Sequence, residues 1–190
     1  MGALSLSAWL APALMMSASA PAADPWHTQI QAASLRFGVP EPWIRAVIRL
    51  ESGGRTERHG RPIRSVKGAM GLMQLMPGTW RDMRSRHGLG TDPDHPGDNI
   101  LAGTAYLRLL YEQFGYPGMF AAYNAGPGRY AAWRNRGVAL PAETRAYLSA
   151  TLSLLGADIE PVAPSIGMTA SWRTLFVPLA GQPRDASEPQ

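Results

Sequence analysis

The chain has 190 residues, which suits one domain of about 100–200 residues with a tail. Hydrophobic residues make up 45% and charged residues 17%, a composition that excludes a wholly disordered chain. The absence of cysteine excludes disulfide scaffolds, thiolate zinc sites and cysteine nucleophiles. The formal net charge of +4 suits an anionic partner without choosing among a polymer, a wall and a membrane.

The first predicted element is a secretory leader, residues 1–22. Residues 2–23 carry no charged side chain, and their apolar run, 4–16, is shorter than the ~20 residues of a membrane-spanning helix. Residues 20–22 give the small-x-small pattern that precedes a cleavage point, although no Lys or Arg stands near the start. We therefore expect export to the periplasm. The alternatives are an uncleaved membrane anchor and a cytoplasmic amino-terminal helix.

Residues 23–156 are predicted to form one all-α domain. Apolar residues recur at helical spacing between Gly and Pro, and almost nothing alternates with period two, so we expect little or no β structure. Asp24 and Thr79 are expected to cap helices at their N-termini. The expected helices cover residues 25–37, 42–51, 70–75, 79–87, 96–114, 119–125, 128–134 and 141–155.

Residues 157–190 are predicted to form a tail. The helical periodicity fades from Ala157, and prolines recur through the rest of the chain. The apolar residues 172–179 form a candidate docking segment for the domain or for a partner, and the remainder is typical of a linker.

The main chemical signal is Glu51, at the end of the second expected helix. Val47 and Ile48 share its helix face, so Glu51 lies at the edge of an apolar surface if they face the core. Loss of solvent raises the pKa of a carboxyl, and a protonated carboxyl can donate to a glycosidic oxygen. Gly53 and Gly54 let the chain turn away and leave the carboxyl open. The alternative is a solvated charge at a helix end.

Two further segments carry side chains suited to sugars. Gln74 is the one polar side chain in the decapeptide 68–77, and its amide can donate to and accept from hydroxyl and acetamido groups. Tyr123 and Asn124 place an aromatic ring beside an amide at a helix end. The alternative is core packing by the methionines and the tyrosine, with Gln74 bonded to buried backbone.

These residues resemble the soluble lytic transglycosylase family, whose catalytic domain has a lysozyme-like fold. Five blocks stand in the family's order and cover about residues 40–155. The blocks are Glu51-Ser52, Ser65-x-x-Gly68-Ala69-Met70-Gly71-Leu72-Met73-Gln74-Leu75-Met76-Pro77, Asn99-Ile100-x-x-Gly103-x-x-Tyr106-Leu107, Ala122-Tyr123-Asn124-Ala125-Gly126-Pro127-Gly128 and Pro141-x-Glu143-Thr144-x-x-Tyr147.

The resemblance implies a helical domain, of the type found in goose-type lysozymes and lytic transglycosylases, that binds peptidoglycan glycan strands. It implies cleavage of the β-1,4 bond between N-acetylmuramic acid and N-acetylglucosamine, with Glu51 acting first as acid and then as base. The C6 hydroxyl of muramic acid would attack the anomeric carbon and give a 1,6-anhydro product. The matched substrate-binding residues are Ser65, Met70, Gln74, Tyr123 and Asn124, with Glu143 and Tyr147 bracing or lining the cleft.

Two alternatives keep the same site. A lysozyme-type hydrolase would use Glu51 with a second carboxylate, and although none lies within five residues, Asp82, Asp98 or Glu143 could approach it in space. A non-catalytic wall-binding assembly factor would keep the cleft and tolerate loss of Glu51.

The basic residues between Arg55 and Lys67 are a candidate for binding the carboxylates of stem peptides, and a solvated surface loop is the alternative. The small size resembles family members that accompany conjugation and type IV secretion machines, which would be partners for the tail. We expect the protein to be a monomer. We expect no nucleic-acid partner, because no recognised nucleic-acid-binding motif is present. We expect no cofactor and no metal, since the four histidines lack paired ligand spacing.

Overall fold

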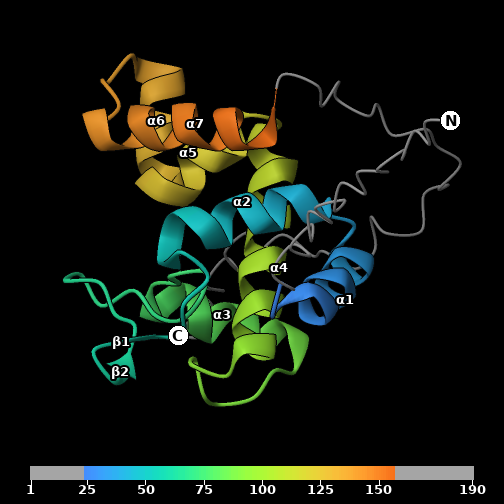
Figure 1. Ribbon diagram of the computed structural model, residues 1–190. Coiled ribbons are helices and arrows are strands. Elements are labelled where there is room, and N and C mark those ends of the chain that lie inside the picture. Colours follow the sequence, from blue (N-terminus) through green and yellow to red (C-terminus); the bar gives the residue numbers. More distant parts are fainter. Residues whose placement is uncertain (1–23, 157–190) are drawn as a thin grey trace, which may run out of the picture. The chain divides into compact units, whose positions relative to one another are not determined.

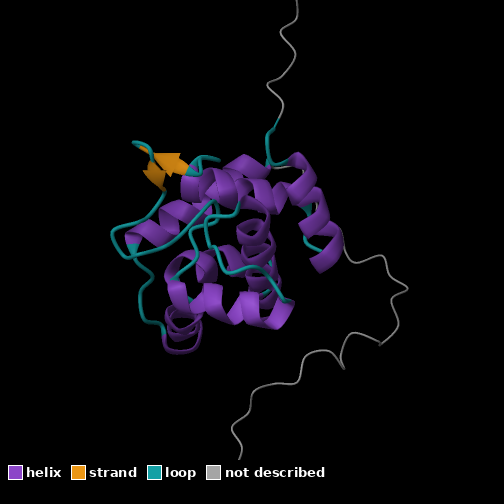
Figure 2. Cartoon of the chain, turned by 90° about the horizontal axis from the view of Figure 1, so that it is seen from below, coloured by secondary structure: helices purple, strands orange, loops and turns teal. Residues whose placement is uncertain are grey.

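The computed structural model describes residues 24–156, and the predicted leader (1–22) and tail (157–190) lie outside the described residues. The described part is helical with one small antiparallel hairpin, which confirms the all-α prediction (Figure 2). The elements are α1 (His27–Phe37), α2 (Glu41–Ser52), β1 (Glu57–Arg58), β2 (Arg61–Pro62), α3 (Pro77–His87), α4 (Pro96–Phe114), α5 (Gly118–Ala125), α6 (Pro127–Arg136) and α7 (Ala142–Leu155).

Helix α4 is the central element of the domain. It packs against α1, α3 and α5, and Ile100, Leu107 and Leu110 on it are buried. Apolar residues on several sides are expected for a helix with neighbours on more than one face. Figure 1 shows α5, α6 and α7 toward one end of α4 and α1 and α3 toward the other, with α2 crossing between the two groups. Helix α2 contacts both groups, through α1 and α7.

The two predicted N-caps are wrong. Helix α1 begins at His27, and the Asp24 carboxylate instead accepts from the Trp26 N–H at 2.9 Å, before the helix. Helix α3 begins at Pro77, so Thr79 lies within its first turn. Proline suits that first position because it lacks the N–H that a helix leaves unpaired there.

The predicted helix over residues 70–75 is also wrong. Met70 and Leu75 pair as a β-bridge, with N···O distances of 2.9 and 3.0 Å, and the residues between them form a turn. Gly71 (φ +71°) and Gln74 (φ +46°) have left-handed backbone conformations, which no right-handed helix contains. Periodicity could not make this distinction, because a mostly apolar segment of six residues fits a helix and a buried turn equally well.

The buried side chain of Asn99, in the first turns of α4, holds this turn in place. Its Oδ1 accepts from the Met73 N–H at 2.8 Å. Its Nδ2 donates to the Met70 carbonyl at 3.1 Å and to the Pro93 carbonyl at 2.9 Å. One fully buried amide therefore satisfies three backbone groups that would otherwise be buried without partners.

Two glycines allow the turn to approach α4 this closely. A Cβ on Gly71 would lie 2.3 Å from Nδ2 of Asn99, and a Cβ on Gly103 would lie 2.4 Å from Sδ of Met73. Real Cβ contacts are not this short, so any side chain at either position would push the turn off the helix. The glycines in these two sequence blocks thus serve the packing of the turn on α4.

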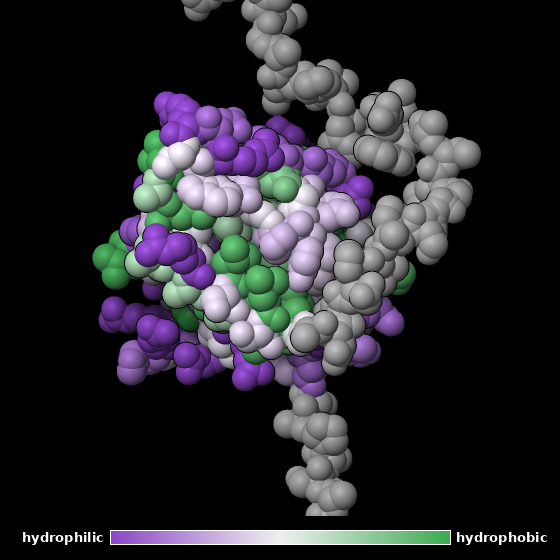
Figure 3. Space-filling model, turned by 90° about the horizontal axis from the view of Figure 1, so that it is seen from above, coloured by the Kyte–Doolittle hydropathy of each residue, from purple (hydrophilic) through white to green (hydrophobic). Residues whose placement is uncertain are grey.

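The end of the domain that carries α6 and α7 exposes apolar side chains, and Figure 3 looks onto this end. Trp133 is 40% exposed and Val138 50%. An apolar hollow of about 700 Å³, lined in part by Trp133, Leu148 and Leu152, lies between α5, α6 and α7. Within residues 24–156, no helix has both the length and the apolar character that crossing a membrane requires.

Replacing Asn99 by alanine should lower the free energy of unfolding by about 3 kcal/mol, because three buried backbone groups lose their partner at once. Urea denaturation measures this change. The matched control is Asn135→Ala on the exposed face of α6, which should change stability by no more than about 0.5 kcal/mol. Equal effects of the two substitutions would contradict the role given to Asn99.

Candidate active site

The position of Glu51 is set by the way α2 ends. Gly53 (φ +65°) and Gly54 (φ +73°) follow it in left-handed conformations that turn the chain away from the helix axis. The buried Ser52 hydroxyl accepts from the Gly54 N–H at 3.2 Å, and the Trp26 indole N–H donates to the Gly54 carbonyl at 2.9 Å. The chain therefore leaves the helix after Ser52, one residue beyond Glu51, and Gly53 and Gly54 make the turn that the sequence predicts.

The environment of Glu51 makes it a weak acid. Val47 and Ile48 on the preceding turn are buried, as expected, and Glu51 itself is only partly exposed. Burial raises the pKa of Glu51 from 4.5 to about 7, and the negative charge of Glu143 acts in the same direction. The Tyr147 hydroxyl acts in the opposite direction, because it favours the charged carboxylate. A large share of Glu51 is therefore protonated at neutral pH.

Two tyrosines from different helices lie close to this carboxyl. Burial and the charge of Glu51 both raise the pKa values of Tyr123, on α5, and Tyr147, on α7. The Tyr123 hydroxyl donates to the Met73 carbonyl at 2.8 Å, which ties α5 to the turn 70–75. The buried Tyr147 hydroxyl has no partner of full hydrogen-bond geometry among the described residues, although the Glu51 carboxylate is near enough to affect it.

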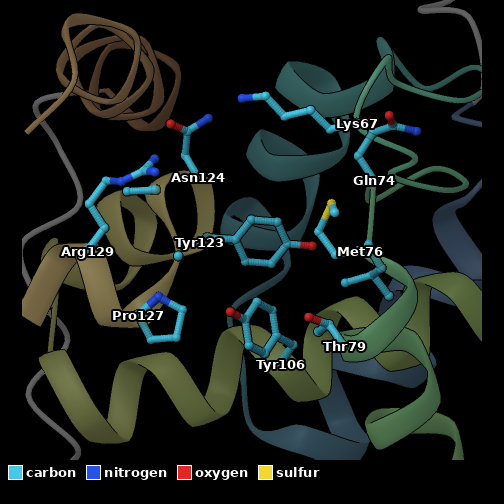
Figure 4. Close-up of a pocket in the computed structure, with 12 residues that line it drawn as sticks. Lys67, Gln74, Met76, Thr79, Tyr106, Tyr123, Asn124, Pro127 and Arg129 are labelled. Atoms are coloured by element: carbon cyan, nitrogen blue, oxygen red, sulfur yellow. The ribbon is translucent and has the colours of Figure 1, made fainter.

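Three of the predicted site residues meet in one pocket of about 420 Å³. Gln74, Tyr123 and Asn124 line it, and Figure 4 shows the Tyr123 ring at its centre. The Asn124 Oδ1 accepts from the Thr144 hydroxyl at 2.8 Å, so its NH₂ group is the end of the amide left for a ligand. The Gln74 Nε2 donates to the Gly71 carbonyl at 2.8 Å, so its Oε1 is left as an acceptor.

The other predicted residues do not line this pocket. Glu51, Glu143 and Tyr147 form a group beside it, linked to it through Tyr123. The Ser65 hydroxyl accepts from the Ala69 N–H at 3.0 Å, within the loop that leads to the turn. Met70 forms one side of the β-bridge that closes the turn. Substrate contacts by Ser65 and Met70 therefore stay predictions.

Several pocket residues were missed by the sequence analysis as binding residues. Tyr106 packs against Tyr123, with ring centroids 5.4 Å apart, and burial raises its pKa to about 12. A signal was present, because Asn99, Gly103 and Tyr106 follow one another at i, i+4 and i+7 and so share a face of α4. No such signal marked the other missed residues, which include Met76, Thr79, Pro127 and Arg129. Lys67 also lines the pocket, and it belongs to the basic segment predicted as a candidate for binding carboxylates.

The arrangement places a carboxyl that is protonated near pH 7 beside a pocket with aromatic and amide groups. The carboxyl can act as a general acid, and the pocket can hold a ring that carries hydroxyl and acetamido groups. Within residues 24–156, no three His, Asp or Glu side chains come together as ligands for a metal ion.

Known proteins are similar to this chain in sequence. The family model described as "Transglycosylase SLT domain" matches residues 28–144. The soluble lytic murein transglycosylase of Escherichia coli K12 is 40% identical over 102 residues, which cover 50% of this chain and 15% of that protein. The endo-type membrane-bound lytic murein transglycosylase A of Klebsiella pneumoniae is 37% identical over 91 residues, 45% of this chain and 42% of that protein.

A solved structure shares the fold. An inactive glutamate-to-glutamine mutant of the lytic transglycosylase Slt from Pseudomonas aeruginosa superposes with a TM-score of 0.60 at 32% identity. The superposition covers 69% of this chain and 24% of that one. The chain thus spans only a small part of the length of the larger relatives that it matches.

Replacing Glu51 by glutamine should stabilise the protein in a pH-dependent way. The folded pKa of Glu51 is raised, so its protonated form favours folding below pH 4.5, and this contribution is lost as the pH rises through about 7. Glutamine avoids the loss, and the variant should unfold with a free energy higher than wild type by about 2 kcal/mol at pH 8 and by little at pH 4.

Urea denaturation at several pH values between 4 and 8 measures the difference. Glu57→Gln, in the exposed hairpin strand β1, is the matched control for losing one carboxyl group. A difference between Glu51→Gln and wild type that is the same at pH 4 and pH 8 would contradict a buried, weakly acidic Glu51.

Proposed function

The chain belongs to the transglycosylase SLT domain family, and on this premise we propose that it is a peptidoglycan lytic transglycosylase. It cleaves the β-1,4 bond between N-acetylmuramic acid and N-acetylglucosamine. The observation that carries the proposal is the Glu51 carboxyl, with a pKa of about 7, beside a pocket with sugar-binding groups. The names of the relatives, which are lytic murein transglycosylases, support the same substrate class.

In the first proposed step, the Glu51 carboxyl donates its proton to the glycosidic oxygen. The bond between that oxygen and C1 of the muramic acid breaks, and N-acetylglucosamine leaves with a free 4-hydroxyl. In the second step, the Glu51 carboxylate accepts the proton of the muramic C6 hydroxyl while O6 bonds to C1. The product is a 1,6-anhydromuramic acid, no water is consumed, and Glu51 is protonated again. A pKa of about 7 suits both steps, because the group must donate and accept a proton at similar pH.

The surrounding residues have supporting roles in this proposal. Gln74 and Asn124 offer an acceptor and a donor to the sugar substituents, and Tyr123 supplies an aromatic face. Tyr147 lies near the Glu51 carboxylate and favours its charged form, as the second step needs. Burial is the main reason for the high pKa of Glu51, and the negative charge of the exposed Glu143 acts in the same direction.

The setting of the enzyme is also a proposal. A cleaved leader at residues 1–22 would deliver a monomer to the periplasm, where the substrate lies, and association with the membrane is an alternative. The tail, residues 157–190, would contact a secretion or conjugation apparatus that needs a local opening in the wall. Support comes from the sequence of these segments alone, since they lie outside the described residues.

Glu51→Gln should abolish product release from purified sacculi, because glutamine cannot donate or accept the proton. Mass spectrometry of the released muropeptides should show wild-type products lighter by one water than hydrolytic ones. The purified Glu51→Gln protein should still bind sacculi in a sedimentation assay, since the pocket is intact. Release that continues in Glu51→Gln would exclude this residue as the acid, and a wild-type protein that binds without cleaving would indicate an assembly factor.

The runner-up is a hydrolase of the same bond, and one observation favours it. Among the three carboxylates considered as partners of Glu51, only Glu143 is near enough to change its pKa. A hydrolase of the usual kind needs a second carboxylate at about 5–10 Å.

Glu143→Gln separates the two reactions. If the enzyme is a transglycosylase, this variant should keep anhydro products at a rate within about threefold of wild type. The basic side of its pH–rate profile should move to lower pH, because removal of a neighbouring negative charge lowers the pKa of Glu51. Reducing-end products in wild type that disappear in Glu143→Gln would instead establish hydrolysis.

A further inference from the structure

The loop between α2 and the turn 70–75 carries six basic residues, and only one of them lines the pocket. That residue is Lys67, the single lysine of the chain. Arg64 instead forms an ion pair with Asp94. The remaining members of the loop are exposed and do not line the pocket: Arg55, Arg58, His59 and Arg61. The tertiary structure thus places one cation of this loop, Lys67, in the pocket.

A second cation lines the pocket from the opposite side. Arg129 lies in the first turn of α6, about 60 residues from Lys67 along the chain. Figure 4 shows Lys67 and Arg129 extending into the pocket from opposite sides, with the Asn124 side chain between their charged ends in this view. Two elements that are far apart in sequence therefore bring positive charge to one site.

This positive charge is not balanced within the pocket. No Asp or Glu belongs to its lining. Among the described residues, Lys67 and Arg129 take part in none of the ion pairs, whereas Arg45, Arg64 and Arg108 each have a carboxylate partner. A pocket with two unpaired cations, an amide donor from Asn124 and a hydroxyl from Thr79 is suited to an anion with several oxygen atoms.

We propose that Lys67 and Arg129 bind a carboxylate carried by the muramic acid substituent and so make the enzyme select carboxylated glycan over neutral glycan. The inference rests on the proposed function and names the substrate feature that the pocket recognises. The carboxylate can belong to the stem peptide or to the lactyl group that remains when the peptide is removed. Both sources have the same charge and the same oxygen geometry.

The placement of the cations away from the acid is consistent with this role. Glu51 is not part of the pocket lining, and neither cation contributes to the shift of its pKa. An anion bound between Lys67 and Arg129 therefore neutralises positive charge in the pocket. It does so without changing a charge that sets the pKa of Glu51. Both side chains are exposed, so solvent and salt weaken their attraction for a carboxylate.

The test compares kcat/KM of the full chain on three glycan preparations. The first carries stem peptides with free carboxylates, the second is the same material with all carboxylates amidated by carbodiimide coupling, and the third is trimmed by an amidase to leave lactyl carboxylates only. The variants are Lys67→Gln, Arg129→Gln and the double variant. The matched control is Arg58→Gln with Arg61→Gln, which removes two exposed cations of the same loop outside the pocket.

We expect each single variant to lose about threefold in kcat/KM on the first preparation, through KM, and the double variant about tenfold. Wild type should lose about tenfold when the carboxylates are amidated, and the double variant should show no further loss. Raising the ionic strength should weaken wild type more than the double variant. Lys67→Arg should keep the preference, because it keeps the charge, and the control should match wild type throughout.

The third preparation shows whether the lactyl carboxylate is bound as well as the stem-peptide carboxylate. Wild type should discriminate trimmed from amidated strands if both are bound, and should treat them alike if only the stem-peptide carboxylate is bound. An equal loss by the double variant on all three preparations, or no loss on any, would overturn the inference. The proposed function is judged separately, by Glu51-dependent release of anhydro products from the amidated strands, on which Lys67 and Arg129 have no effect.

Discussion

The site depends on one buried amide. Asn99 binds three backbone groups of the segment that precedes α4, and these bonds hold the turn 70–75 on α4. That turn presents Gln74 to the pocket, and its Met73 carbonyl accepts the Tyr123 hydroxyl from α5. A hydrogen bond of a buried polar group is worth little when made and much when lost, so the amide specifies this arrangement more than it adds stability.

The raised pKa of Glu51 has a different physical cause. Glu51 owes its raised pKa to the loss of solvent at the end of α2, where the helix passes between the two groups of helices and buries Val47 and Ile48. The same loss of solvent disfavours the charged form in the folded protein, so chemical usefulness and stability conflict at this residue above neutral pH. Ser52 and Trp26 hold the turn that follows Glu51 through hydrogen bonds with Gly54.

Negative and positive charges occupy separate regions of the site. Glu51 and Glu143 lie near α7, whereas Lys67 and Arg129 line the neighbouring pocket, and Tyr123 belongs to both regions. Mixing the two sets would lower the pKa of Glu51, because a cation close to a carboxyl favours its charged form. The separation lets one small site contain a protonated acid and a surface suited to anions, which suits a polymer whose reacting bond is neutral and whose substituents are charged.

The sequence by itself determined the all-α class, the two ends of α4, and Glu51 at an apolar helix end, because each follows from spacing and from Gly and Pro. It could not distinguish a helix from a turn at residues 70–75, because the hydrogen bonds that decide come from Asn99, more than twenty residues away. The choice of Lys67 from a basic loop, and its pairing with Arg129, likewise required the tertiary structure. Local pattern specifies which face of an element is buried, but only packing between distant elements decides which side chains share a pocket.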